Sequence, residues 1–322
     1  MEEVSKNLFM LTLPMPFRLM HVHVFILLTE EGVILFDAGL NTQENFHLLS
    51  QALNSLGKNI KDIREIFITH FHADHCGMAG LIKEIGGAKI AMSAAAEGLL
   101  GRRKNEIFYA QFRDFCYKCG LPQTTAESLL TMFVHFKEAP RPFEIDSYIE
   151  EKSYRRGNFL WEALFTPGHS PDHVSFYFPK EKHLIAGDHI LPEITPNLSP
   201  DLLSPQYEPL KEFLTSLEKI QGYNIKKVLP AHGTPFLDLN RRVEELKNHH
   251  RLRTELIHKS LSGEKNVFQI ACEIFGEDLT DFDYFLAIGE TFAHLQYLVA
   301  TGLIKENLRE GRFCYEVLTQ LV

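Results

Sequence analysis

Three histidines and one aspartate lie within six residues of this sequence, in the run THFHADH. The run directly follows the apolar residues 66–68, a pattern typical of a buried strand that ends in a loop. Side chains two residues apart share a face at an extended strand end, so His70 and His72 can bind one ion. Asp74 and His75 follow on the next turn and can bind a second ion beside it.

Three further candidate ligands lie downstream, each at the end of an apolar run: His169 in TPGHS, Asp188 in AGDH and His232 in LPAHG. In this layout a rigid sheet directs residues from its loops toward one point. A lone histidine at a strand end is usually structural, but a cluster of five histidines and two aspartates is typical of a metal site. Such ligands suit two divalent ions without any cysteine; zinc is expected, with iron and manganese as alternatives.

The four motifs, in this order, resemble the metal-binding motifs of the metallo-β-lactamase superfamily, over roughly residues 1–240. The resemblance implies an α/β fold, the four-layer αββα sandwich, with a dinuclear metal site along one edge. It also implies the assignment of the ligands: His70, His72 and His169 to one ion, Asp74, His75 and His232 to the other, and Asp188 as the bridge between them.

Two divalent ions about 3.5–4 Å apart lower the pKa of a shared water from about 15.7 to near 7. The sequence therefore predicts a dinuclear hydrolase that uses a metal-bridging hydroxide. Asp74 is the predicted catalytic residue, because its carboxylate can orient the hydroxide and take its proton. The resemblance places Asp188 at the bridging position, where hydrolases such as glyoxalase II and RNase Z have an aspartate and the lactamase classes generally do not. We therefore expect no β-lactamase activity.

Four other residues lie beside these ligands. Asp37 ends the strand-like run VILFD, and the resemblance implies that it supports the metal loop; the alternative is a simple turn aspartate. His173 and His189 can each bond a ligand carboxylate, contact substrate or be structural. Cys76 directly follows the histidine motif, but the ligand set is complete without it.

Short elements must position the ligands. Hydrophobic patterning predicts strands at residues 8–13, 22–28 and 33–36. It also predicts one helix over residues 42–56, ending at a glycine, and another over about 77–85 that stops at a Gly-Gly pair.

A helical, aromatic insert is expected over about residues 94–150. Phe108, Phe112 and Phe115 follow helical spacing, which usually indicates core; the alternative is a lid that gives the substrate an apolar wall. The CxxC at 116–119 has no second pair, which favours helical core or surface over a metal or redox site. Residues 139–146 are expected to form the loop that returns to the sheet.

The C-terminal part is expected to be separate. We predict a catalytic domain over residues 1–240 and, over 241–322, a linker helix and a domain that resembles a winged helix. The histidines of the long charged helix (about 238–260) are expected to face solvent: His249, His250 and His258. Residues 263–322 hold four basic and ten acidic residues, a net charge of −6, which would repel duplex DNA. This domain is expected to pack against the catalytic domain or a homodimer mate.

Length and composition agree with this organisation. The 322 residues suggest two domains, and 45% hydrophobic with 23% charged residues is ordinary for a globular protein. We expect no signal peptide, and the apolar run 22–28 is too short to span a bilayer. Five cysteines without a framework spacing favour a reducing compartment, so a cytoplasmic location is expected.

Three classes of function are compatible with the sequence. The first is a hydrolase of a small thioester, ester or lactone. The second is a metal-dependent phosphodiesterase or endoribonuclease, against which the net charge of −9 weighs for long nucleic acids. The third, a non-catalytic regulator, conflicts with a complete ligand set. Glyoxalase II itself is weakly supported, because the C-terminal part lacks a basic cluster for glutathione.

Overall fold

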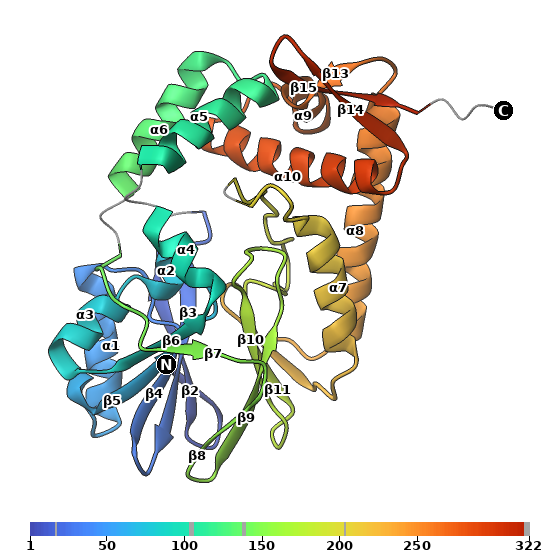
Figure 1. The fold of residues 1–322 in the computed structure, drawn as a ribbon. Coiled ribbons are helices and arrows are strands. Elements are labelled where there is room, and N and C mark those ends of the chain that lie inside the picture. The colour runs from blue at the N-terminus through green and yellow to red at the C-terminus, as the bar shows by residue number, and fades with distance from the viewer. Residues whose placement is uncertain (17, 103–105, 137–139, 203, 319–322) are drawn as a thin grey trace. The chain divides into compact units, whose positions relative to one another are not determined.

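The computed structural model describes residues 1–322 except positions 17, 103–105, 137–139, 203 and 319–322 (Figure 1). The chain forms two compact units, each built from three segments. Unit 1 comprises Met1–Gly101, Glu138–Pro196 and Ser216–Arg242, and unit 2 comprises Arg102–Lys137, Asn197–Thr215 and Val243–Val322. The domains expected at 1–240 and 241–322 stay a prediction.

Unit 1 contains a seven-stranded sheet whose strands lie in chain order. The first four strands pair antiparallel, and the remaining pairs are parallel. The strands are β1 (Glu2–Ser5), β2 (Leu8–Pro14), β3 (His21–Thr29), β4 (Gly32–Phe36), β5 (Ile63–Phe67), β6 (Lys89–Ser93) and β7 (Ser147–Ile149). The strands predicted from residues 8–13, 22–28 and 33–36 are therefore confirmed.

A second sheet in unit 1 has five strands in the order β12-β11-β10-β9-β8. The β11–β12 pair is parallel and the other pairs are antiparallel. Its strands are β8 (Ser153–Arg156), β9 (Phe159–Phe165), β10 (Val174–Phe178), β11 (His183–Gly187) and β12 (Lys227–Pro230). It follows from these pairings that β9, β11 and β12 run in the same direction, so their carboxyl ends reach one edge of the sheet.

The two sheets of unit 1 face each other across an apolar core. Phe36 and Phe67 from the first sheet meet Trp161 from the second, with ring centroids 5.5 Å and 5.3 Å from the indole. Burial of each such large side chain stabilises the fold by roughly 1.5–3 kcal/mol. On its other face the seven-stranded sheet packs against apolar residues of two helices, α1 (Gln43–Ser55) and α3 (Ala79–Gly86). Ser216 on helix α7 (Pro209–Gln221) contacts the chain just after β9, where its Oγ donates to the Pro167 carbonyl (2.8 Å).

Capping residues mark the start of helix α1 and the end of helix α3 in unit 1. In α1 (Gln43–Ser55) the side chain of Thr42 accepts a hydrogen bond from the amide of Asn45, and α3 (Ala79–Gly86) ends at Gly87 in the left-handed region. Both predicted helices are confirmed. The remaining short helices are η1 (Ile60–Asp62), α2 (Ala73–Cys76) and α4 (Ala95–Arg102). The expected α/β sandwich fold is confirmed.

Unit 2 is mainly helical, as expected for the C-terminal region. Its helices are α5 (Glu106–Cys119), α6 (Gln123–Phe136), most of α8 (Leu239–Ser260), α9 (Val267–Phe275), α10 (Asp281–Ala300) and the start of α7 (Pro209–Gln221). A three-stranded sheet, ordered β13-β15-β14, completes it: β13 (Lys265–Asn266), β14 (Ile304–Arg309) and β15 (Arg312–Val317). The β14 and β15 strands form an antiparallel hairpin, while the winged-helix resemblance stays a prediction.

The insert helices α5 and α6 share one core with the C-terminal helices. Phe112, Cys116 and Cys119 are buried there, so the interpretation of the aromatic stripe and of the CxxC as helical core is confirmed for these residues. Residues 140–146 form the expected loop between α6 and β7. Within the described ranges, every helix is too short or too polar to cross a bilayer.

One expectation for the long helix α8 was wrong. His250 is buried rather than solvated, and its Nδ1 lies 3.2 Å from Nε2 of His294 on α10. It also packs edge-on against Phe213. The physical reason is its place on the helix, since His250 follows Val243 and Leu246 on the apolar face at spacings of three and four residues.

Candidate metal centre

The predicted ligands all follow carboxyl ends of strands in unit 1. His70 and His72 lie in the bend after β5, and Asp74 and His75 lie on the short helix α2 rather than on a turn. The other three follow strands of the second sheet that run in one direction: His169 after β9, Asp188 after β11 and His232 after β12. The two sheets thus bring residues from four separate segments to one edge.

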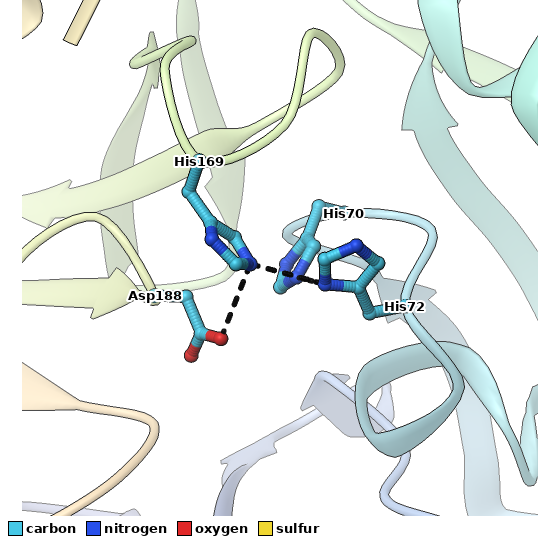
Figure 2. A group of neighbouring side chains, drawn as sticks. All are labelled: His70, His72, His169 and Asp188. Carbon is cyan, nitrogen blue, oxygen red and sulfur yellow. Dashed lines mark hydrogen bonds and ion pairs between the residues drawn. The ribbon is translucent and has the colours of Figure 1, made fainter. Parts of the chain in front are cut away.

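The first group of ligands comprises His70, His72, His169 and Asp188, whose side chains converge in Figure 2. Nδ1 of His72 lies 2.9 Å from Nε2 of His70 and 3.0 Å from Nε2 of His169. The Asp188 Oδ2 atom lies 3.4 Å from the same nitrogen of His169. One atom from each of these four residues can therefore face a single point.

The second group comprises Asp74, His75 and His232. The His75 Nε2 and His232 Nε2 atoms lie 3.6 Å and 3.4 Å from Asp74 Oδ2. The same two nitrogens lie 3.4 Å and 3.2 Å from the other carboxylate oxygen of Asp188, Oδ1. Asp188 thus presents one oxygen to each group.

These separations fit a metal ion. A tetrahedral ion with bonds of about 2.0–2.1 Å to nitrogen and oxygen has ligand atoms roughly 3.3–3.4 Å apart, close to the four distances in the second group. Two nitrogens of this group and the Asp188 oxygen that faces them are buried without a hydrogen-bond partner among the described residues: His75 Nε2, His232 Nε2 and Asp188 Oδ1. Because buried polar atoms are rarely left unsatisfied, this arrangement supports the interpretation of a cation site.

Asp37 holds two of the histidines from behind. Its Oδ2 accepts from Nδ1 of His75 (2.7 Å) and from the hydroxyl of Thr69 (2.9 Å), while Oδ1 accepts from the Thr69 amide (2.7 Å). Since the Thr69 hydroxyl donates to Asp37, its lone pair is left to accept from Nδ1 of His70 at 3.0 Å. The outer nitrogens thereby carry protons, so Nε2 is the ring atom that His70 and His75 can offer to an ion.

The backbone at Asp37 is itself unusual. Its φ of 62° lies in the left-handed region, which aspartate tolerates better than most residues. Such strain at a functional site costs of order 1–3 kcal/mol and persists where the surroundings fix the conformation. The predicted supporting role of Asp37 agrees with these contacts.

His173 contacts the backbone of a ligand rather than its carboxylate. Its Nε2 accepts from the amide of Asp188 (3.1 Å), and its Nδ1 lies 2.8 Å from the hydroxyl of Thr166. His189 is buried with its ring centroid 6.0 Å from that of His173, and burial lowers its pKa to about 3. Cys76 donates its thiol to the Phe71 carbonyl (3.1 Å) and is not among the atoms grouped above.

The two groups differ in their protonation. Burial, followed by the neighbouring histidines, lowers the pKa of His70 and of His72 well below the ordinary value. Burial also opposes charge on His75 and His232, but the Asp188 and Asp74 carboxylates outweigh it and raise the pKa of His75, and raise that of His232 to about 10. Burial would raise the pKa of Asp74, yet His75 and His232 hold it at about 2.

Sequence reasoning missed several residues that touch the ligands. Thr69 stands between Asp37 and His70, and His21 accepts from the ring of His232 through its backbone carbonyl (2.7 Å). Thr69 begins the histidine motif, so its position next to a ligand was a usable signal. His21 and His23 alternate with valines in an apolar strand, and histidines inside such a strand could have marked them.

Comparison with known proteins identifies the superfamily of this chain. Residues 18–232 match the metallo-beta-lactamase superfamily. The chain is 25% identical over 330 residues to the "Probable metallo-hydrolase YqjP" of Bacillus subtilis, covering 97% of this chain and 98% of that protein. The crystal structure of a metallo-beta-lactamase family protein from Thermus thermophilus is 27% identical, with a TM-score of 0.85 over 97% of this chain and 99% of that one.

A shorter match concerns an enzyme with a named substrate class. Over 83 residues the chain is 32% identical to the "Atrochrysone carboxyl ACP thioesterase" of Aspergillus fumigatus, covering 26% of this chain and 24% of that protein. The match to the superfamily, in contrast, extends over well more than half of the sequence. The chain therefore belongs to the metallo-β-lactamase superfamily.

Proposed function

We propose that this protein is a dinuclear metal-dependent hydrolase of small-molecule thioesters or related esters and lactones. The chain is a hydrolase by its superfamily and by its full-length relatives. The observation that carries the dinuclear proposal is the position of Asp188. One of its oxygens lies 3.4 Å from His169, and the other lies 3.2–3.4 Å from His232 and His75, so it can serve two ions at once.

In this proposal the first group would hold one ion and the second group the other, with Asp188 between them. When bound, two divalent ions supply an activated water and polarise the group under attack. The sandwich contributes a rigid frame, because each ligand follows a strand end and most are buried. Zinc fits the mixture of imidazole and carboxylate, and iron and manganese use the same ligands.

Asp74 has the geometry for a second role. Its side chain is 19% exposed, whereas those of Asp188 and His232 are 9% and 3% exposed. It is thus the more accessible of the two carboxylates, and it is ionised, since its pKa lies at about 2. A partly exposed, ionised carboxylate beside the site can orient the attacking water and accept its proton.

Charge and the thioesterase match favour acyl substrates. The chain carries a net charge of −9, which disfavours long polyanions such as nucleic acids. The printed activity of the Aspergillus fumigatus enzyme belongs to that protein, but its local similarity to this chain supports thioesters as the first class to test.

The test compares two substrates in the zinc-loaded protein. We would measure kcat/KM for an acyl-CoA thioester and for bis(p-nitrophenyl) phosphate, with Asp188→Ala as the blank. The matched control is Asp114→Ala, which removes an exposed carboxylate (57% exposed) on α5 of unit 2. We expect thioester turnover that Asp188→Ala abolishes and Asp114→Ala preserves.

Two results would change the proposal. Phosphodiester turnover without thioester turnover would make the phosphodiesterase the better assignment. Thioester turnover that survives in Asp188→Ala, with full metal content, would contradict the dinuclear mechanism. Repeating the assay with iron and with manganese would then identify the metal that gives the highest kcat/KM.

A further inference from the structure

Four hydrogen bonds join residues 21–23 of β3 to residues 231–233 after β12. The backbone amide of His23 donates to the Ala231 carbonyl (2.7 Å), and Nδ1 of His232 donates to the His21 carbonyl (2.7 Å). The amide of Gly233 donates to Nε2 of His21 (3.0 Å), and Nε2 of His23 donates to the Gly233 carbonyl (2.7 Å). This seam connects the two sheets of unit 1 at a predicted ligand.

We propose that the His21 and His23 side chains are positioning residues that set the metal affinity of the second ligand group, by fixing Gly233 and thereby the ring of His232. The proposal rests on the dinuclear site proposed above. Neither side chain belongs to the two ligand groups, and both act through the backbone that follows His232.

The direction of each bond follows from its partner. A backbone amide can only donate, so Nε2 of His21 accepts from Gly233; a carbonyl can only accept, so Nε2 of His23 carries the proton. The Nδ1 atom of His23 is then left to accept from the hydroxyl of Thr12, which lies 3.1 Å away. The two histidines thus bind opposite ends of one residue with complementary roles.

Gly233 needs such restraint. Its φ of +79° lies in the left-handed region, and a Cβ there would lie 2.5 Å from Cγ of Pro192, so the position requires glycine. Glycine has the freest backbone of all residues. Without partners on both its amide and its carbonyl, the peptide next to His232 could rotate and carry the imidazole away from Asp74 and Asp188.

His232 is held differently from His70 and His75. His75 is oriented by the Asp37 carboxylate and His70 by the Thr69 hydroxyl. The Nδ1 of His232 is instead bonded to the backbone carbonyl of His21, whose position depends on the other hydrogen bonds between residues 21–23 and 231–233. Loss of the seam should therefore weaken the second ion and leave the first nearly unchanged.

The experiment measures metal binding, which does not depend on turnover. Metal-free protein would be titrated with zinc against a chromophoric chelator, and cadmium-113 NMR would resolve the two sites. In His21→Ala and in His23→Ala we expect the second zinc to bind about 10–100-fold more weakly, with the first unchanged. His23→Gln should restore binding, because its amide nitrogen can donate to the Gly233 carbonyl. The exposed His47→Ala is the matched control.

Outcomes separate this proposal from the proposed function. If each zinc ion binds His21→Ala and His23→Ala as tightly as it binds the wild type, the positioning role is overturned. Parallel weakening of both ions, or no rescue in His23→Gln, would also overturn it, as a merely structural role would give these results. Thermal unfolding of the metal-free variants identifies misfolded protein. His21→Ala should perturb the fold less than His23→Ala, because His21 is half-buried and His23 is buried. Wild-type protein that binds two ions without cleaving thioesters would contradict only the proposed substrate.

Discussion

The two ligand groups use similar side chains but lie in opposite electrostatic settings. In the first group burial and mutual proximity lower the pKa of His70 and His72, so these rings are neutral. In the second group the carboxylates of Asp74 and Asp188 face His75 and His232 and raise the pKa of both rings. In the proposed site a cation would therefore meet neutral rings in the first group and protonated rings in the second.

This difference indicates what each group contributes. A cation entering the first group gains neutral nitrogen ligands without displacing a proton. A cation entering the second group must displace protons from rings that are already paired with carboxylates. The two sites should then differ in pH dependence although they share Asp188, and the following predictions test that contrast.

Removal of the shared ligand should have the largest effect. In Asp188→Ala both groups lose an oxygen, and His75 and His232 lose the partner that raises their pKa. A loss of several kcal/mol in transition-state stabilisation corresponds to at least about a 100-fold fall in kcat/KM. Kinetics and metal content measured on the same samples check this. Wild-type kcat with two bound ions would show that Asp188 is not a bridge.

Asp37→Asn should weaken both groups through their outer contacts. The substitution removes a carboxylate oxygen that accepts from Nδ1 of His75 and from Thr69, which in turn contacts His70. We expect about 10–100-fold weaker binding of both ions, measured by chelator competition. Thr69→Val, which keeps the contact between Asp37 and His75, should weaken mainly the first ion. A reversed order of sensitivity would contradict the assignment of these supports.

Local spacing made most of this site predictable. The histidine motif and the three later ligands each follow a short apolar run, and a strand that ends at a ligand can be read from neighbouring residues alone. Asp37 also ends a strand, but its proposed support of the metal loop was implied by the family resemblance, with a simple turn aspartate as the alternative. The sandwich fold and the assignment of ligands to two ions came from the resemblance to a family rather than from the pattern itself.

Contacts between distant segments could not be predicted in this way. His23 and Gly233 are 210 residues apart in sequence, and only the packing of the two sheets brings them to 2.7 Å. His250 was expected in solvent because its helix is highly charged, yet the apolar face of that helix includes it. In both cases the deciding factor is which face a neighbouring element covers, and this depends on tertiary structure.

Zinc affinity should depend on pH in one group more than in the other. His232, with a pKa of about 10, is protonated at pH 7 in the metal-free protein and must lose that proton to bind. Binding of the second ion should therefore strengthen about tenfold per pH unit for each proton released, between about pH 6.5 and 9. Affinity for the first ion should be nearly constant over this range. Calorimetry in buffers of different ionisation enthalpy counts the protons, and equal proton release from both sites would remove the contrast.

The smallest effect should be on the stability of the metal-free protein. The pKa of His232 is raised from 6.5 to about 10 in the folded state, so its stabilising contribution is complete below pH 6.5 and is lost as pH rises through about 10. We expect the Tm of the metal-free protein to fall by a few degrees between about pH 7 and 9.5 relative to His232→Gln, which lacks this titration. Zinc-loaded protein, whose ligand rings are already deprotonated, should show little of this decline. A metal-free Tm with the same pH dependence in wild type and His232→Gln would mean that the Asp74 and Asp188 carboxylates do not hold a proton on His232.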